Sequence, residues 1–254
     1  MSRLANRVAL VTGGGAGMGL ASARALAAEG ASVVIADKNP DAAALAAQSI
    51  RASGANAVSY TVDVAVLTEL RALFDFIDQT FGRLHIFFSN AGVGGAHGFD
   101  VTPEQFDAVF DVNLKSSFFA TTYALPLLRP CAPHASIIYM SSIRGLHARG
   151  KNPLYSMSKA GIIMMARLFA RHLGPEGIRA NALCPGGVQT AFPRDWLGLS
   201  EDEYKVVLEK SAAEVPLGRI AQPEDIAALV VFLASDQAAY LTGLAIPVDG
   251  GTMA

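Results

Sequence analysis

A tyrosine and a lysine four residues apart, Tyr155 and Lys159, are the side chains of this sequence best suited to moving a proton. Residues i and i+4 of a helix share one face, so the phenol and the ammonium would lie side by side. A free tyrosine has a pKa of about 10, too high for an efficient base at neutral pH, and a neighbouring ammonium favours the phenolate. The pair predicts acid–base chemistry in which Tyr155 transfers the proton and Lys159 lowers its pKa.

A serine hydroxyl follows an apolar run shortly before this pair. Ser142 lies 155 − 142 = 13 residues before Tyr155 and comes just after Ile137-Ile138-Tyr139-Met140. Open α/β sheets bind ligands at the carboxyl ends of their strands, so this hydroxyl is expected where it could donate to a substrate oxygen. The adjacent Ser141 is the alternative, and the 13-residue spacing favours Ser142.

A glycine-rich turn, Thr-Gly-Gly-Gly-Ala-Gly-Met-Gly at residues 12–19, links the first expected strand to a helix. Glycines allow a tight turn and a close backbone approach to a pyrophosphate, and the helix N-terminus offers N–H groups and a positive dipole. The turn predicts a dinucleotide site formed by Gly13, Gly15, Gly17, Met18 and Gly19. The same glycines could serve the methyl donor of a methyltransferase, and the turn does not separate these two classes.

The second expected strand ends in Asp37, which bears on the choice of dinucleotide. A carboxylate at this position can accept hydrogen bonds from the adenosine ribose and repels a 2′-phosphate. Asp37 therefore favours NAD(H). The neighbouring cation Lys38 could pair with that phosphate, so the pattern leaves NADP(H) open.

The elements that must position these groups alternate between strand and helix. Strands are expected at 7–12, 32–36, 57–61, 84–89, 136–140, 178–183 and 245–248, and helices at 17–29, 41–53, 66–81, 103–128, 153–173 and 223–234. Strands such as Val8–Val11 are apolar throughout, as in sheets covered on both faces. The sequence predicts a single α/β domain, 1–254: a Rossmann-type, doubly wound parallel sheet of about seven strands with helices on both faces. The irregular stretch 190–215, with a short helical segment around 201–210, is expected to be a substrate lid.

Composition narrows the classes of function. Among 254 residues, 52% are hydrophobic and 17% charged, as in a chain with a sizeable core. The net charge of −2 predicts no nucleic-acid partner, and no apolar run is long enough to predict a membrane span. The two cysteines, Cys131 and Cys184, are far apart in the sequence and the histidines are scattered, so we expect no disulfide and no metal site. The low cysteine content predicts a cytoplasmic location.

In this order, the motifs resemble those of the short-chain dehydrogenases/reductases over nearly the whole chain. The matching segments are Thr12-Gly13-x-x-x-Gly17-x-Gly19, Asp63-Val64, Asn90-Ala91-Gly92, the tetrad Asn113, Ser142, Tyr155 and Lys159, Pro185-Gly186-x-x-x-Thr190, and Asp249-Gly250-Gly251. The resemblance implies that Asp63, Val64, Asn90, Ala91 and Gly92 lie beside the adenosine, and that Pro185, Gly186, Val188 and Thr190 hold the nicotinamide side.

The resemblance also implies a division of labour within the tetrad. Tyr155 gives or takes the substrate proton, Ser142 polarises the substrate oxygen, and Lys159 holds the nicotinamide ribose. Asn113 bends its helix and anchors a water molecule that relays protons; its alternative is a helix-interior polar residue with a local backbone bond. We expect an NAD(H)-dependent oxidoreductase that interconverts a secondary alcohol and a ketone.

The substrate is less constrained. The pocket is expected to include Gly94, Arg144, Arg149, Gly187, Phe192 and Trp196. The glycines leave room and the aromatic rings offer apolar walls, which suits a medium-sized cyclic or aromatic substrate. The basic segment around Arg144 would attract an anionic group, so a 3-oxoacyl carrier-protein-type reductase is an alternative; solvated loop charges are the other explanation. A non-catalytic nucleotide-binding protein is a further alternative, which the intact tetrad disfavours.

The family usually forms homotetramers, and the resemblance implies the same here, with helices 103–128 and 153–173 at one interface. The second of these helices carries more apolar side chains than one buried stripe needs. They are Ile162, Ile163, Met164, Met165, Leu168 and Phe169.

Overall fold

The computed structural model describes residues 2–148 and 151–254. It contains a seven-stranded sheet in the order β3-β2-β1-β4-β5-β6-β7, and every pair of neighbouring strands is parallel. The strands are β1 (Val8–Thr12), β2 (Ser32–Asp37), β3 (Ala57–Thr61), β4 (Ile86–Ser89), β5 (Ser136–Met140), β6 (Arg179–Pro185) and β7 (Ala245–Val248). The expected doubly wound parallel sheet is confirmed, with strand ends that differ by a few residues.

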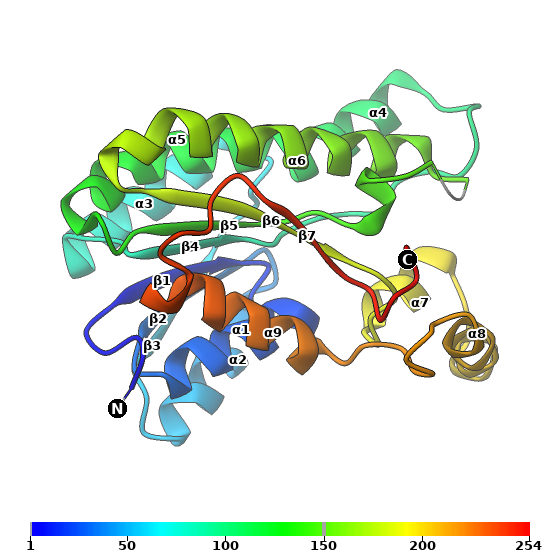
Figure 1. Cartoon of the computed structure of the whole chain (residues 1–254), viewed down its shortest axis with the longest axis horizontal. Helices are drawn as coiled ribbons and strands as arrows, with labels where there is room; N and C mark the ends of the chain where they lie inside the picture. The colour runs from blue at the N-terminus through cyan, green and yellow to red at the C-terminus, as the bar shows by residue number, and fades with distance from the viewer. Residues whose placement is uncertain (1, 149–150) are drawn as a thin grey trace.

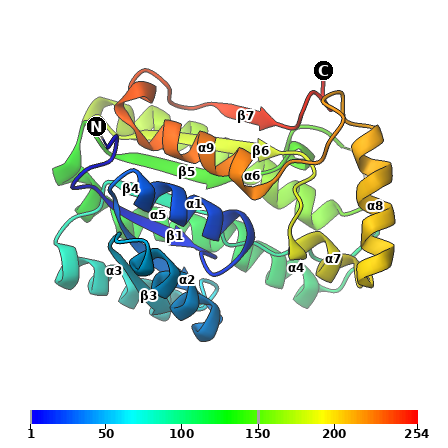
Figure 2. The ribbon, with the colours of Figure 1, turned by 90° about the horizontal axis from the view of Figure 1, so that it is seen from below.

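Two layers of helices cover the sheet (Figures 1 and 2). The helices are α1 (Gly17–Ala28), α2 (Pro40–Ala52), α3 (Leu67–Phe81), α4 (Pro103–Phe110), α5 (Ser116–Leu128), α6 (Pro153–Leu173), α7 (Ala191–Leu197), α8 (Glu201–Ala213) and α9 (Pro223–Ala234). Helices α3, α5 and α6 lie on one face, and α1, α2 and α9 lie on the other. This arrangement explains why β1, β4 and β5 are buried throughout, whereas the edge strand β3 keeps exposed side chains at Ser59 and Thr61.

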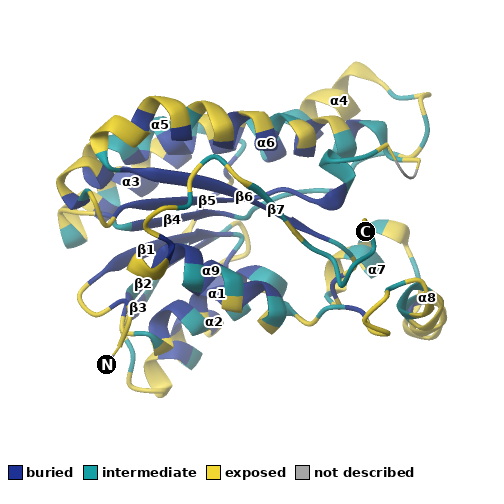
Figure 3. Ribbon diagram, in the orientation of Figure 1, coloured by how far each residue is buried: buried dark blue, intermediate teal, exposed yellow. Residues whose placement is uncertain are grey.

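Alternate side chains of each strand enter opposite cores, as a pleated strand requires. In β1, Leu10 packs with the core under α3, α5 and α6, whereas Ala9 and Val11 pack with the core under α1, α2 and α9. All three side chains are fully buried (Figure 3). Burial on both sides fixes the register of the strands and so the place of every loop at their carboxyl ends.

The expected continuous helix 103–128 is interrupted at its centre. Between α4 and α5 the chain forms a π-helical segment, Asp111–Lys115, with Asn113 at its middle. Such wide turns occur often at functional sites because they redirect one side chain. The expectation that the helix departs from regular geometry at Asn113 therefore agrees with the fold.

The stretch 190–215 is more helical than expected: the helical segment expected around 201–210 is present as α8, whereas α7 was not expected. Helix α7 begins directly after Thr190, and α8 begins after Ser200, whose hydroxyl accepts from the Glu203 N–H in a capping box. Both helices lie beyond the carboxyl ends of β6 and β7 (Figure 2). The stretch is thus an ordered cover beside the edge where ligands bind in such sheets.

Candidate active site

Helix α6 presents Tyr155 and Lys159 to the carboxyl end of β5. The Lys159 side chain is buried, and its Nζ donates to the carbonyl of Met140, the last residue of β5, at 2.8 Å. The same Nζ lies 5.5 Å from the centre of the Tyr155 ring. Burial penalises the ammonium and lowers the pKa of Lys159 from 10.5 to about 8.

The surroundings of Tyr155 contradict one expectation from the sequence. A hydrogen bond with the Ser142 hydroxyl and the charge of Arg144 both lower the pKa of the phenol, but burial outweighs them and the pKa is raised. The expected lowering by Lys159 is therefore not the dominant effect. The Lys159 ammonium donates to the Met140 carbonyl, and burial favours its neutral form by lowering its pKa. Burial thus favours the protonated phenol, which suits a proton donor.

The two adjacent serines have different surroundings. The Ser141 hydroxyl donates to the Lys159 carbonyl at 2.8 Å, so it ties β5 to α6. The Ser142 hydroxyl accepts from the Arg144 N–H at 3.1 Å, lies 3.5 Å from the Pro185 carbonyl, and reaches Tyr155. Ser142 thus lies beside the phenol, as the 13-residue spacing predicted.

Asn113 lies beneath this group, almost completely buried. Its Nδ2 donates to the Val93 carbonyl and to the Ser158 hydroxyl, each at 3.0 Å, and its Oδ1 accepts from the Val93 N–H at 2.8 Å. Ser158 precedes Lys159 on α6. Asn113 therefore joins the loop after β4 to the helix that carries the tyrosine and lysine.

The glycine turn packs where side chains would not fit. A Cβ on Gly19 would overlap the Gly13 carbonyl, and a Cβ on Gly13 (φ 61°) would lie 3.1 Å from Asn90 Nδ2 and from Ala91 Cα. Asn90 Nδ2 donates to the carbonyls of Thr12 and Gly13, each at 3.0 Å. These bonds hold the turn after β1 against the loop after β4.

Asp37 is fixed at the end of β2 by backbone donors. Its Oδ2 accepts from the Gly15 N–H at 2.9 Å, and its Oδ1 accepts from the Asn39 N–H at 3.0 Å. The Lys38 side chain next to it is exposed. Asp63, at the end of the neighbouring β3, accepts from the Ala65 N–H at 2.9 Å. These carboxylates lie along the sheet edge beyond the glycine turn.

A cavity of about 630 Å³ runs from the glycine turn to Tyr155. It gathers most of the site residues expected from the sequence: Gly13, Gly17, Met18, Gly19, Asn90, Ala91, Gly92, Ser142, Arg144, Tyr155, Lys159, Pro185, Gly186, Gly187, Val188, Thr190, Phe192 and Trp196. Those that do not line it are Gly15, Asp37, Lys38, Asp63, Val64, Gly94 and Asn113. Arg149 lies outside the residues that the structure describes.

These residues fit a dinucleotide. The turn leaves no space for side chains, the carboxylate of Asp37 is held beside Gly15, and the cavity continues to the buried Lys159. Pro185, Gly186, Val188 and Thr190, in the segment after β6, line the same cavity. A Cβ on Gly17 would lie 3.3 Å from Thr190 Cγ2, so the glycine turn and the segment after β6 lie within contact distance.

Several cavity residues were missed by the reasoning from sequence. Val207 and Ser211 of α8, Val215 just after it, Ile220 and Thr252 all line the cavity. The signal in the sequence was the i, i+4 spacing of residues 207 and 211, which places them along one side of α8. Tyr204 of α8 is buried, and its hydroxyl donates to the Thr190 carbonyl at 3.0 Å, so it tethers α8 to the segment after β6.

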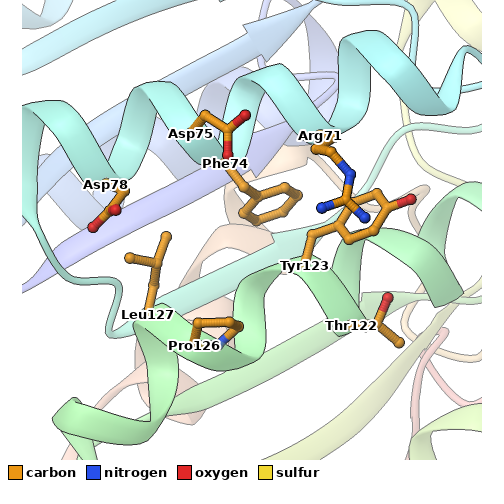
Figure 4. A pocket seen from close by; sticks show the side chains of 8 residues that line it. All are labelled: Arg71, Phe74, Asp75, Asp78, Thr122, Tyr123, Pro126 and Leu127. Carbon is orange, nitrogen blue, oxygen red and sulfur yellow. The ribbon is translucent and has the colours of Figure 1, made fainter.

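A second pocket, of about 400 Å³, lies between α3 and α5 (Figure 4). Arg71 and Tyr123 both line this pocket, and the Arg71 guanidinium lies 4.4 Å from the centre of the Tyr123 ring. None of the expected site residues lines it. Across residues 2–148 and 151–254, no group of three or more His, Cys, Asp or Glu side chains is arranged to hold a metal, and no helix is long and apolar enough to cross a bilayer. Both cysteines are buried and free.

The sheet, the glycine turn and the Tyr155–Ser142–Lys159 group together define a nucleotide-dependent oxidoreductase. A family model described as enoyl-(acyl carrier protein) reductase matches residues 13–253. The chain is 37% identical to galactitol 2-dehydrogenase of Agrobacterium fabrum, with 98% of each chain covered. It is 37% identical to trihydroxynaphthalene reductase PfmaI of Pestalotiopsis fici, with 98% of this chain and 90% of that one covered.

The same relationship appears among solved structures. A short-chain type dehydrogenase/reductase from Mycobacterium marinum superposes with a TM-score of 0.89 at 29% identity, covering 98% of this chain and 96% of the other. The chain belongs to the short-chain dehydrogenase/reductase family, and it is an oxidoreductase of that family.

Proposed function

We propose that this oxidoreductase uses NAD(H) to interconvert a medium-sized cyclic or aromatic secondary alcohol and its ketone, with Tyr155 as general acid and base. The observation that carries the proposal is the joint placement of the phenol, the Ser142 hydroxyl and the Lys159 ammonium along one cavity with the glycine turn. A bound nicotinamide dinucleotide supplies or accepts the hydride.

The residues of the chain handle the substrate oxygen. The Ser142 hydroxyl, already within hydrogen-bonding reach of the phenol, orients and polarises that oxygen. Tyr155 gives its proton to the oxygen during reduction and takes it back during oxidation. Because burial raises the pKa of Tyr155, the free enzyme starts in the form ready for reduction. The charge of Lys159 favours the phenolate left behind.

The choice of NAD(H) follows from Asp37. Its carboxylate accepts from two backbone N–H groups, which fixes it at the end of β2, where a 2′-phosphate would meet a negative charge. Gly15 is tightly confined there, because a Cβ on it would lie 3.0 Å from Asp37 Oδ2. The exposed Lys38 next to Asp37 is a cation that favours NADP(H).

A second substrate class has a specific observation in its favour. Arg144 lines the cavity close enough to Tyr155 to lower its pKa, so a substrate with an anionic arm would find a positive charge near the reacting oxygen. The description of the family model that matches the chain, enoyl-(acyl carrier protein) reductase, names a substrate bound to an acyl carrier protein. A 3-oxoacyl carrier-protein-type substrate is the alternative, and Arg144→Ala would then raise KM for it much more than for neutral ketones.

The test of the reaction is the pair Tyr155→Phe and Tyr123→Phe. Tyr123 is a phenol on α5, away from the cavity, and serves as the matched control. Tyr155→Phe should abolish turnover of a panel of cyclic and aryl ketones while keeping NADH binding, and Tyr123→Phe should retain both. Turnover that survives Tyr155→Phe would overturn the assigned role. A wild-type chain that binds NADH but turns over nothing in a broad panel would indicate a nucleotide-binding protein instead.

A further inference from the structure

Helix α7 places the indole of Trp196 directly on the loop that follows β4. Trp196 Nε1 donates to the Gly95 carbonyl at 2.6 Å. A Cβ on Gly94 would overlap Cδ2, Cε2 and Nε1 of the indole. The indole can therefore lie flat on the backbone at this point because residue 94 has no side chain.

The same indole is the centre of an aromatic cluster that reaches the site. Its ring centre lies 5.3 Å from that of Tyr155, 5.5 Å from that of His97 and 5.7 Å from that of Phe192. The rings of His97 and Trp196 are nearly parallel, at 21°, and Asn152 at the start of α6 hydrogen-bonds His97 at 2.8 Å. Trp196 thus joins the loop after β4, the start of α6 and helix α7 into one wall.

This wall borders the place where the chemistry is proposed to occur. Trp196 and Phe192 both line the cavity, and both stay partly exposed rather than fully buried as core residues would be. Helix α7 begins directly after Thr190, so the position of the indole depends on the segment that follows β6. A flat apolar ring beside a proton donor favours a planar group that can stack on it.

We propose that Trp196, seated on Gly94, determines substrate specificity: its docked indole limits the cavity to compact substrates that carry a single flat ring. This inference rests on the proposed oxidoreductase function and deepens it. Larger fused-ring substrates are excluded because their second ring would occupy the space that the indole fills. Gly94 acts as a positioning residue, since any side chain there pushes the indole off its seat.

The first experiment compares NADH-dependent reduction of one-ring and two-ring aryl ketones by the wild type, Trp196→Ala, Gly94→Ala and the double variant. Each single substitution should raise the ratio of kcat/KM for two-ring over one-ring ketones by at least about tenfold, the scale on which a changed pocket wall discriminates between substrates. The double variant should show no more than the effect of one substitution, because both act on the same indole. Val206→Ala, an exposed side chain of α8 that does not line the cavity, is the matched control and should leave the ratio unchanged.

The second experiment needs no turnover, because Trp196 is the sole tryptophan of the chain. Intrinsic fluorescence therefore reports the indole directly. Gly94→Ala should shift the emission to longer wavelength and increase quenching by acrylamide, whereas Val206→Ala should do neither. In the turnover comparison of the first experiment, Trp196→Phe keeps a flat ring and loses the donor to Gly95, so it should retain most of the size limit.

The outcomes separate this inference from the proposed function. If the wild type reduces none of the ketones, the proposed function fails, whatever the fluorescence shows. If the enzymes are active but Trp196→Ala leaves the ratio of two-ring to one-ring turnover unchanged, the specificity role of Trp196 is overturned alone. If Gly94→Ala leaves the emission wavelength and the acrylamide quenching unchanged, Gly94 does not position the indole of Trp196.

Discussion

The amide of Asn113 binds both backbone groups of Val93: its Oδ1 accepts from the N–H at 2.8 Å and its Nδ2 donates to the carbonyl at 3.0 Å. The same Nδ2 reaches Ser158 on α6. This arrangement explains why the helix widens at Asn113, since a π-helical turn carries the amide between the loop after β4 and α6.

We predict that Asn113→Ala destabilises the chain as well as impairing turnover. The substitution removes the side-chain partners of the partly buried N–H and carbonyl of Val93, which costs about 2–3 kcal/mol in the free energy of unfolding. Urea denaturation followed by far-UV circular dichroism measures this loss. The control is Asn39→Ala at the exposed cap of α2, where about 1 kcal/mol is expected. An Asn113→Ala variant that lost turnover at full stability would show that the amide acts on the reaction alone.

The ionisation of Lys159 gives a prediction with a definite sign. Its pKa is about 8 in the folded chain and 10.5 as its ordinary value, so between these pH values the unfolded chain binds more protons. The free energy of unfolding contributed by this residue therefore rises with pH in that window, and the penalty for burying the cation returns as pH falls through about 8.

Lys159→Met removes this penalty and should alter the pH dependence of stability. The difference in unfolding free energy, variant minus wild type, should shrink by about 2–3 kcal/mol from about pH 7 to about pH 10. Subtracting the two curves cancels the titration of all other groups, and the lost bond to Met140 adds an offset that does not vary with pH. Parallel curves across this window would mean that Lys159 titrates near its ordinary value.

The carboxylate of Asp37 gives a prediction about the cofactor. The wild type should use NAD(H) in preference to NADP(H), and Asp37→Ser should reduce that preference by at least about tenfold, or ~1.4 kcal/mol. The loss comes from removing a negative charge that Gly15 and Asn39 hold in place. The measurement is kcat/KM for both dinucleotides with one ketone.

Lys38→Ala is the companion variant for this measurement. It should leave NAD(H) use intact and reduce whatever NADP(H) use the wild type has. A wild type that prefers NADP(H), together with a Lys38→Ala variant that loses this preference, would reverse the assignment of cofactor.

The sequence was informative wherever chemistry depends on local spacing. The turn at 12–19, the i, i+4 pair Tyr155–Lys159 and the 13-residue offset to Ser142 all predicted neighbours, because parallel strands end at a common edge. The direction of the pKa shift of Tyr155 was wrong, because burial is a property of the whole packed site. The sequence predicted Gly94 and Trp196 at the same pocket but not their direct contact, which joins residues 196 − 94 = 102 positions apart and depends on tertiary packing rather than on local spacing.

The last prediction concerns the outer face of α5 and α6, where we expect this chain to associate as a homotetramer. Phe118 of α5 is 46% exposed, and Met164 and Leu168 of α6 are each 52% exposed. The neighbouring α6 residues Ile162, Ile163 and Met165 are buried. Helix α6 thus has an apolar face that its own core does not cover. Leu168→Glu should dissociate the assembly as measured by multi-angle light scattering, since each symmetric interface would bury the new charge twice. Leu45→Glu, on α2 and 64% exposed, is the matched control and should leave the mass unchanged. A wild type with a monomer's mass, or a Leu168→Glu variant that stays assembled, would show that this face is not the interface.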